Sequence, residues 1–289
     1  MDAIRMRGSC ALAACGVAAL LGAASPAAAA TLDLSIGWVS AEGEFEGDEE
    51  VTLTRLPIEL VFGRNNGRFT IVLPFTRIDR TGDVTWSADG PILLSVNSPS
   101  GPPFQTSAVG GSESGLGDII LRDETYLVRA GGGRRPQLSW ILEAKVQTAD
   151  EKEGLGTGKS DYKVGLSYVQ PLGRVVQILG DASYTFMGSP GGLDFDDRVA
   201  LGAGFALVSN RTTWRVTVEN ITPPLDEVPR FDGAGAQVGV LEVDDRRVAR
   251  LELIGRSRRG GSVGVAASWG LTDSSEDFGF MLRLSSASR

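Results

Sequence analysis

Residues 138–146 read LSWILEAKV, and this stretch decides the fold class. Apolar residues occupy every second position from Leu138 to Val146, whereas Glu143 and Lys145 fall on the intervening positions. Side chains alternate between the two faces of a strand, but in a helix of 3.6 residues per turn the apolar set would be scattered around the circumference. The stretch therefore predicts a β-strand with one apolar and one polar face.

The same alternation recurs along the chain and predicts twelve strands. Each predicted strand has the roughly nine to eleven residues that a tilted strand needs to cross a bilayer. The even count, with short and long connections in turn, is typical of a closed outer-membrane barrel. The sequence thus predicts an all-β fold, a transmembrane antiparallel up-and-down β-barrel. The predicted strands are 31–40, 51–63, 67–78, 116–128, 136–148, 160–171, 174–186, 197–208, 211–221, 246–255, 261–271 and 277–285.

Charge is sorted between the two sets of connections. Arginines lie in or beside the short turns, at positions 64, 129, 134, 135, 174, 211, 256, 258 and 259. Acidic residues fill most of the long connections, which are 41–50, 79–115, 149–159, 187–196 and 222–245, with a brief one at 272–276. We expect the arginines to meet anionic lipid headgroups on the periplasmic side of the bilayer. The acidic loops would then face outward, towards lipopolysaccharide.

The first thirty residues have the layout of a cleavable export signal. Arg5 and Arg7 precede an apolar run, and small residues at Ala28 and Ala30 form a cleavage site before Thr31. The prediction is a signal peptide at 1–30, a single barrel domain at 31–289 and a location in the cell outer membrane. A lipoprotein site ending at Cys15 is the alternative for this segment.

Composition excludes several classes of chemistry. The chain has no histidine, and both of its cysteines lie in the predicted signal, so no Ser-His or Cys-His pair and no His or Cys metal site can form in the mature chain. A net charge of −8 argues against nucleic acid as a partner. We therefore expect no enzyme activity, no catalytic residues, no metal and no cofactor.

Residues 153–168, EGLGTGKSDYKVGLSY, contain a Gly-Lys-Ser that superficially matches a phosphate-binding loop. That motif requires a glycine where this chain has Glu153, and it requires a following helix. Here a predicted strand follows instead. The stretch is interpreted as an outer hairpin loop whose glycines can take positive φ, and Lys159 and Ser160 receive no chemistry.

Three stretches fit the barrel less simply. Asp123 falls on the apolar face of its strand. Either a β-bulge hides its side chain from lipid, or the barrel tolerates the free-energy cost of one exposed acid. The segment AQVGVLEV, 236–243, also alternates, but a thirteenth strand would break the even count, so it is expected to stand in the long loop. The loop 79–115, which contains Trp86 and Phe104, is expected either to fold inward as a constriction or to be an ordinary outer loop with a short hairpin.

The inward positions of the predicted strands carry eight basic and six acidic residues. Such a balanced set favours ion pairs that fill the interior, with a selectivity device as the alternative. A twelve-stranded barrel lies between small filled barrels and wide porins, so we expect a narrow bore. The lumen-lining candidates are Arg55, Glu59, Arg68, Arg122, Glu124, Glu143, Lys145, Lys163, Asp181, Arg215, Glu219, Arg250, Glu252 and Arg283.

A longer pattern in the middle of the chain resembles a family of outer-membrane barrels associated with the meta-pathway of phenol degradation. The matching stretches are GLGDIILRDETYLV at 115–128, LEAKVQTADEKEGLGTGKSDYKVGLSYVQPLG at 142–173 and ASYTFMGSP at 182–190. The family usually has Pro-Thr-Gly where this chain has Gln147-Thr148-Ala149. The resemblance implies an outer-membrane barrel that moves hydrophobic or aromatic compounds, and it implies no catalytic residues.

The leading functional hypothesis is a channel or transporter for small, hydrophobic or aromatic solutes. The alternative is a structural or adhesive outer-membrane barrel that transports nothing. A membrane-embedded hydrolase and a soluble periplasmic β-protein are the remaining hypotheses. The sequence leaves the solute, the openness of the lumen and the oligomeric state undetermined.

Overall fold

The computed structural model describes residues 31–45, 49–80, 84–87, 90–93, 111–130, 134–149, 155–188, 195–223, 227–231, 237–242, 244–258, 260–272 and 275–286. The predicted signal peptide at 1–30 lies outside this part of the chain. The strands are β1 (Thr31–Phe45), β2 (Glu49–Arg64), β3 (Gly67–Arg80), β4 (Val84–Ser87), β5 (Gly90–Leu93), β6 (Gly111–Leu116), β7 (Ile119–Val128), β8 (Gln137–Val146), β9 (Asp161–Pro171), β10 (Val176–Phe186), β11 (Arg198–Val208), β12 (Thr212–Ile221), β13 (Glu227–Phe231), β14 (Gln237–Glu242), β15 (Arg246–Arg256), β16 (Ser262–Gly270) and β17 (Phe278–Ser286).

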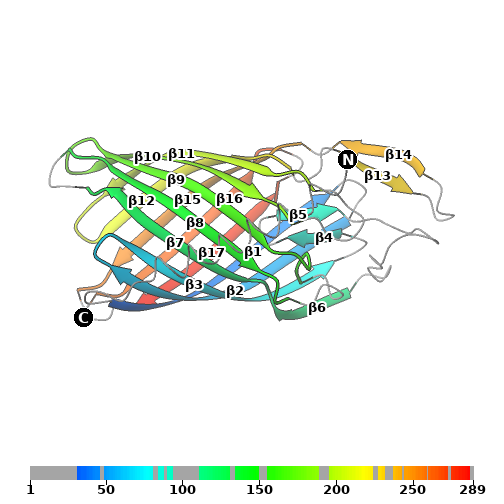
Figure 1. Cartoon of the computed structure of the whole chain (residues 1–289), viewed down its shortest axis with the longest axis horizontal. Coiled ribbons are helices and arrows are strands. Elements are labelled where there is room, and N and C mark those ends of the chain that lie inside the picture. Colours follow the sequence, from blue (N-terminus) through cyan, green and yellow to red (C-terminus); the bar gives the residue numbers. More distant parts are fainter. Residues whose placement is uncertain are drawn as a thin grey trace, which may run out of the picture.

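Twelve of the strands close into a single antiparallel barrel (Figure 1). The ring runs β1-β2-β3-β7-β8-β9-β10-β11-β12-β15-β16-β17, and β17 pairs with β1 to close it. Closure leaves no strand edge without a partner, which is what a sheet needs where lipid cannot supply hydrogen bonds. The predicted twelve-stranded β-barrel is confirmed. No described helix is long and apolar enough to cross a membrane.

The two ends of the barrel differ, and we name them by their connections (Figure 1). At the turn end lie the start of β1, the end of β17 and short connections such as Asn65-Asn66 between β2 and β3. At the loop end lie the long connections together with the small β4–β5 and β13–β14 sheets. The described arginines of the turns beyond β2, from Arg129 to Arg258, are all exposed at the turn end.

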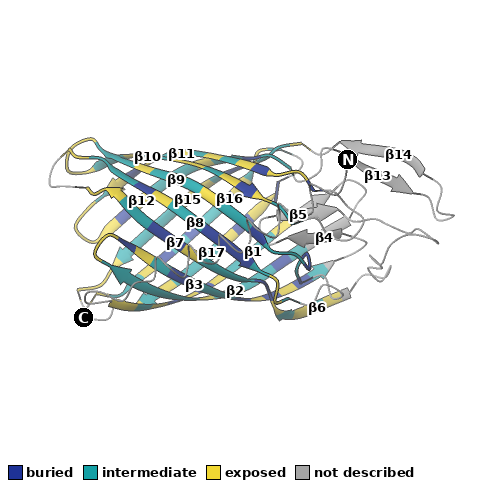
Figure 2. Ribbon diagram, viewed as in Figure 1, coloured by how far each residue is buried: buried dark blue, intermediate teal, exposed yellow. Residues whose placement is uncertain are grey.

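Exposed residues alternate with less exposed ones along the barrel strands (Figure 2), and many of the exposed ones are large and apolar. Large side chains such as Leu201 and Phe205, 56% and 47% exposed, point away from the barrel at alternate positions of β11. Such exposure would be costly in water but suits contact with lipid chains. Aromatic pairs gather towards the strand ends, with Tyr184 and Phe186 at the loop end and Phe62 and Phe69 at the turn end. Rings at these positions are typical of a membrane interface.

Two hairpins are longer than the sequence predicts. The expected loop at 41–50 is wrong, because β1 continues to Phe45 and β2 begins at Glu49. Backbone hydrogen bonds carry this hairpin onward although its residues there are largely acidic and give no apolar alternation. The strand predicted to begin at 116 is preceded by β6, and β6 and β7 pair in turn with β3. Between them the chain breaks its pairing at Gly117 and Asp118.

Asp123 does lie on the exterior side, and an ion pair rather than a bulge accommodates it. Its carboxylate binds the guanidinium of Arg64 and accepts a hydrogen bond from Thr125, and Asp123 is only 2% exposed. Arg64 lies on β2, two strands away, and the intervening position on β3 is Gly67. Because Gly67 has no side chain there, Arg64 can reach across β3 to the aspartate.

The two long loops contain small sheets of their own. β14 pairs with β13 outside the barrel sheet, so the expectation that AQVGVLEV stands in the loop is confirmed. β4 and β5 form a hairpin within 79–115. Phe104 lies outside the described residues, and only the backbone of Trp86 in β4 is described, so the constriction hypothesis stays a prediction.

Candidate functional site

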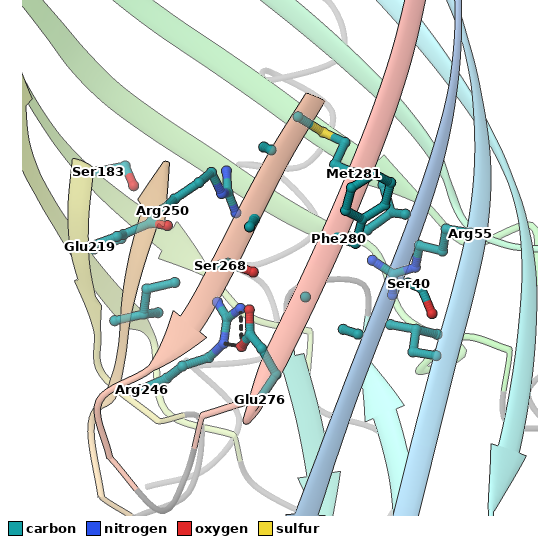
Figure 3. A pocket seen from close by; sticks show the side chains of 18 of the residues that line it. Ser40, Arg55, Ser183, Glu219, Arg246, Arg250, Ser268, Glu276, Phe280 and Met281 are labelled. Atoms are coloured by element: carbon teal, nitrogen blue, oxygen red, sulfur yellow. Dashed lines mark hydrogen bonds and ion pairs between the residues drawn. The ribbon is translucent and has the colours of Figure 1, made fainter. Parts of the chain in front are cut away.

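A cavity of about 390 Å³ lies inside the barrel towards its loop end, and we call it the loop-end cavity (Figure 3). Its walls come from the loop-end halves of most strands, with Arg250 on β15, Glu219 on β12 and Arg55 on β2. The volume falls in the range of sites that hold small molecules. The cavity is therefore a part of the described interior where a solute can be held.

Charge in the loop-end cavity is unbalanced. Among the described residues that line it, six are basic and two are acidic. Arg246 and Glu276 neutralise each other, since both Nε and Nη2 of the arginine donate to one glutamate oxygen at 2.9 and 2.6 Å. The remaining basic residues are Arg55, Arg122, Lys163, Arg198 and Arg250, and the remaining acid is Glu219.

Most of the other described interior charges form ion pairs. Arg68 binds Glu124 at 2.6 Å and Arg215 binds Glu252 at 2.9 Å. Glu143 accepts from Arg122 at 2.6 Å and from Lys163 at 3.1 Å. Arg283 binds Glu59 and also donates through Nε to Ser35 Oγ at 2.8 Å. Each of these carboxylates thus lies beside a cation, as interior charges require.

These pairs run around the wall of the barrel. All but one of them join strands that are hydrogen-bonded neighbours, such as β7 with β8 and β12 with β15. The exception, Arg283 with Glu59, spans only β1. A pair between neighbouring strands neutralises charge without placing side chains across the bore. The wall network therefore does not by itself close the lumen.

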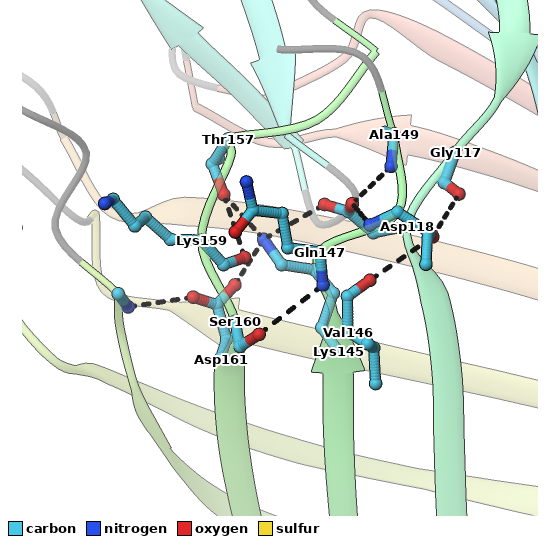
Figure 4. Close-up of polar contacts among 12 residues, drawn as sticks. Gly117, Asp118, Lys145, Val146, Gln147, Ala149, Thr157, Lys159, Ser160 and Asp161 are labelled. Carbon is cyan, nitrogen blue, oxygen red and sulfur yellow. Dashed lines mark hydrogen bonds and ion pairs between the residues drawn. The ribbon is translucent and has the colours of Figure 1, made fainter. Parts of the chain in front are cut away.

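At the loop end a buried ionic cluster holds the connection between β8 and β9 against the wall, and we call it the Lys145 cluster (Figure 4). The Nζ atom of Lys145 lies 2.5 Å from Asp161 Oδ2 and 3.8 Å from Asp118 Oδ2, and it donates to Thr157 Oγ1 at 3.0 Å. Exposure of the three charged side chains is 6% or less. Such buried charges are tolerated only when each has a partner.

The carboxylates of the Lys145 cluster also bind backbone. Asp118 Oδ1 accepts from the amides of Thr148 and Ala149, each at 3.0 Å, and Asp161 Oδ1 accepts from the amide of Gly188 at 2.9 Å. Asp118 lies at the break between β6 and β7, so the break turns a carboxylate towards this loop. Three connections at the loop end are thereby tied to one lysine.

The stretch with Gly-Lys-Ser is part of this arrangement. Gly158 has a φ of 65°, which bears out the expectation that a loop glycine takes the left-handed region. A Cβ on Gly156 would lie 2.7 Å from Asp118 Oδ2, so a side chain there would displace the cluster. Ser160 Oγ is 3.4 Å from the amide of Gln147. The glycines and the serine thus shape a loop that packs against the wall, and a strand follows it.

The structure distributes the sequence candidates among these features. Five candidates line the loop-end cavity, and they are Arg55, Arg122, Lys163, Glu219 and Arg250. Seven others belong to the ion pairs along the wall, and they are Glu59, Arg68, Glu124, Glu143, Arg215, Glu252 and Arg283. Lys145 lies in the Lys145 cluster. Asp181 faces Gly202, where a Cβ would lie 2.2 Å from its carboxylate, so the glycine gives that carboxylate room.

Several interior residues were not among the candidates. Arg198 and Arg246 occupy inward positions at the loop-end starts of their strands, so the same alternation could have found them. Asp118 shares the inward parity of Arg122 in the predicted strand 116–128, so alternation could have found it too, whereas Glu276 lies in a connection where no alternation points to the interior. No group of three or more potential metal-ligating side chains occurs in the part of the chain that the structure describes.

Comparison with solved structures supports the fold. The chain is similar to an outer membrane channel from Pseudomonas putida F1, with a TM-score of 0.67 and 12% identity over 91% of this chain and 97% of that one. It is also similar to the porin NanC, with a TM-score of 0.46 and 8% identity over 88% of this chain and 97% of that one. For the transport unit of the autotransporter AIDA-I from Escherichia coli the TM-score is 0.49 and the identity 10%, over 88% of this chain and 89% of that one.

No protein-family model matches the sequence, and no curated protein matches it. At such low identity the solved structures show the fold alone, which is that of an outer-membrane barrel. The resemblance to barrels associated with phenol degradation therefore bears on function only as a hypothesis.

Proposed function

We propose that this chain is an outer-membrane channel through which small solutes cross. The observation that carries the proposal is the combination of an apolar exterior with a polar, solute-sized cavity inside a closed barrel. A soluble β-protein needs the reverse distribution, with apolar residues inside and polar ones outside. Wall-running ion pairs keep the interior charges satisfied while leaving the bore to solutes.

The solute class follows from the size of the loop-end cavity together with the family resemblance. Its volume of about 390 Å³ suits a solute of one ring or a short chain. The resemblance favours aromatic compounds, and the polar lining favours those that carry a polar substituent. Small substituted aromatic compounds are therefore the solutes that we propose.

The first test is permeation of a neutral solute. Refolded protein in lipid vesicles should let benzamide equilibrate at least about tenfold faster than vesicles without protein, and planar bilayers should show discrete conductance steps. The control is a barrel of known closed interior, reconstituted at the same density. Benzamide uptake equal to that of protein-free vesicles would refute the channel.

The second candidate is a structural barrel that transports nothing. It is favoured by the dense burial of polar groups in the interior, where Ser139, Glu124 and Glu143 are each 9% exposed or less. If deletion weakens the envelope without changing solute uptake, this candidate replaces the channel.

Location and processing belong to the same proposal. Residues 1–30 direct export and are removed, and the barrel of residues 31–289 lies in the outer membrane with its turn end towards the periplasm. The exposed turn arginines, such as Arg174 and Arg211, then meet anionic headgroups, and the acidic loop end meets lipopolysaccharide. Terminal sequencing of the membrane-extracted protein should begin at Thr31. A first residue at Cys15 would instead show a lipoprotein.

A further inference from the structure

We infer that the loop-end cavity is an anion-binding site and that the channel prefers small organic anions with a single carboxylate. This inference rests on the proposed channel and narrows its solute class. It comes from the sign of the charge around the cavity, where the described lining residues include six basic side chains and two acidic ones. Rings of arginine and lysine are the means by which pores favour anions.

Arg250 is the cation that carries the inference. It lines the cavity, and no described residue forms an ion pair or hydrogen bond with it. The nearest acid in the strand pairing is Glu219, which lies on β12 at a position diagonal to Arg250 on β15. The two approach the same cavity without forming an ion pair among the described residues (Figure 3). An arginine left in this state offers its donors to a solute.

Two further cations line the cavity and share one acid. Arg122 and Lys163 both bind Glu143, which is not among the described residues that line the cavity. Glu143 thus fixes the position of both side chains at this wall of the cavity.

Hydroxyl groups complete the donor set. Ser183, Thr185 and Ser268 line the same cavity beside the cationic groups. A hydroxyl can donate to a carboxylate oxygen that an arginine has already attracted. The cavity therefore offers both charge and hydrogen-bond donors to an anion, whereas the described lining offers an ammonium group two carboxylates, those of Glu219 and the paired Glu276.

The test uses three solutes of nearly equal size, which are benzoate, benzamide and benzylammonium. In vesicles with the wild-type channel, uptake of benzoate should exceed uptake of benzamide about threefold and uptake of benzylammonium about tenfold, as expected for a unit charge about 6 Å away in a watery pore. Equal uptake of all three would overturn the inference while leaving the channel intact.

Charge variants locate the effect. Arg250→Gln should lower the benzoate-to-benzamide ratio about threefold, and Glu219→Gln, in the same cavity, should raise it by a similar factor. Arg174→Gln, in the exposed turn between β9 and β10 at the other end of the barrel, is the matched control and should leave the ratio unchanged. A ratio that responds equally to all three variants would also overturn the inference.

Binding separates the inference from the channel itself. ¹⁹F NMR of 4-fluorobenzoate with refolded protein reports occupancy whether or not solutes cross. If benzamide fails to cross but 4-fluorobenzoate binds to the wild type and not to Arg250→Gln, the channel is refuted and the anion site stands. If 4-fluorobenzoate does not bind and benzoate has no advantage in uptake, the anion site is refuted.

Discussion

Replacing Lys145 by methionine should destabilise the barrel by about 3–5 kcal/mol, the cost of removing one partner from a buried ion pair. The methionine has a similar length and no charge, so the two carboxylates of Asp118 and Asp161 would remain buried without their cation. Two buried carboxylates without a cation repel each other and draw in water, and this loosens the loop ties that they hold. The midpoint of urea unfolding, followed by tryptophan fluorescence in detergent micelles, measures the effect.

The matched control for this prediction is Lys163→Met. Lys163 is also an interior lysine on the neighbouring strand, but it is 26% exposed and its partner Glu143 keeps Arg122 at 2.6 Å. Its loss should cost under about 1 kcal/mol. Adding Asp118→Asn and Asp161→Asn to Lys145→Met should restore much of the stability, because no unpaired charge then remains. Equal unfolding midpoints for Lys145→Met and Lys163→Met would contradict the role of the cluster.

The barrel could be predicted from sequence because its two environments dictate a period of two. In LSWILEAKV, lipid on one side and a polar interior on the other require the alternation that the letters show, and β8 occupies Gln137–Val146. The alternation is absent from the extension of β1 and β2 to Phe45 and Glu49 and from the strand β6, GSESGL. Backbone pairing continues through both segments, but their sequences carry no apolar period of two.

The interior arrangement was less accessible to sequence reasoning. Alternation places Lys145 inside the barrel, but it cannot show that Asp118, 27 residues earlier, and Asp161 meet that lysine. The alternation also predicts nearly balanced charge for the interior of the whole barrel. The excess of positive charge appears only when the described residues around the loop-end cavity are considered separately. Contacts between strands depend on register and depth, which no single stretch encodes.

The second large effect is expected on the exterior face, where Ala203→Arg should destabilise the barrel by about 2–4 kcal/mol in lipid. Ala203 lies at the middle of β11 between the exposed side chains of Leu201 and Phe205. If lipid chains cover this face, the arginine must be desolvated or must pull water and headgroups towards it. Urea unfolding of protein folded into lipid vesicles measures the cost.

Depth is the decisive control for this effect. Leu207→Arg makes the same kind of change on the same face of β11, but one residue from its turn end, where the guanidinium can reach the headgroups and should cost about 0–1 kcal/mol. Ala203→Leu should be nearly neutral, because it keeps the face apolar. A barrel whose exterior meets water would tolerate Ala203→Arg within about 0.5 kcal/mol. Such tolerance, equal at both depths, would contradict membrane insertion, since no hydrocarbon layer would then surround β11.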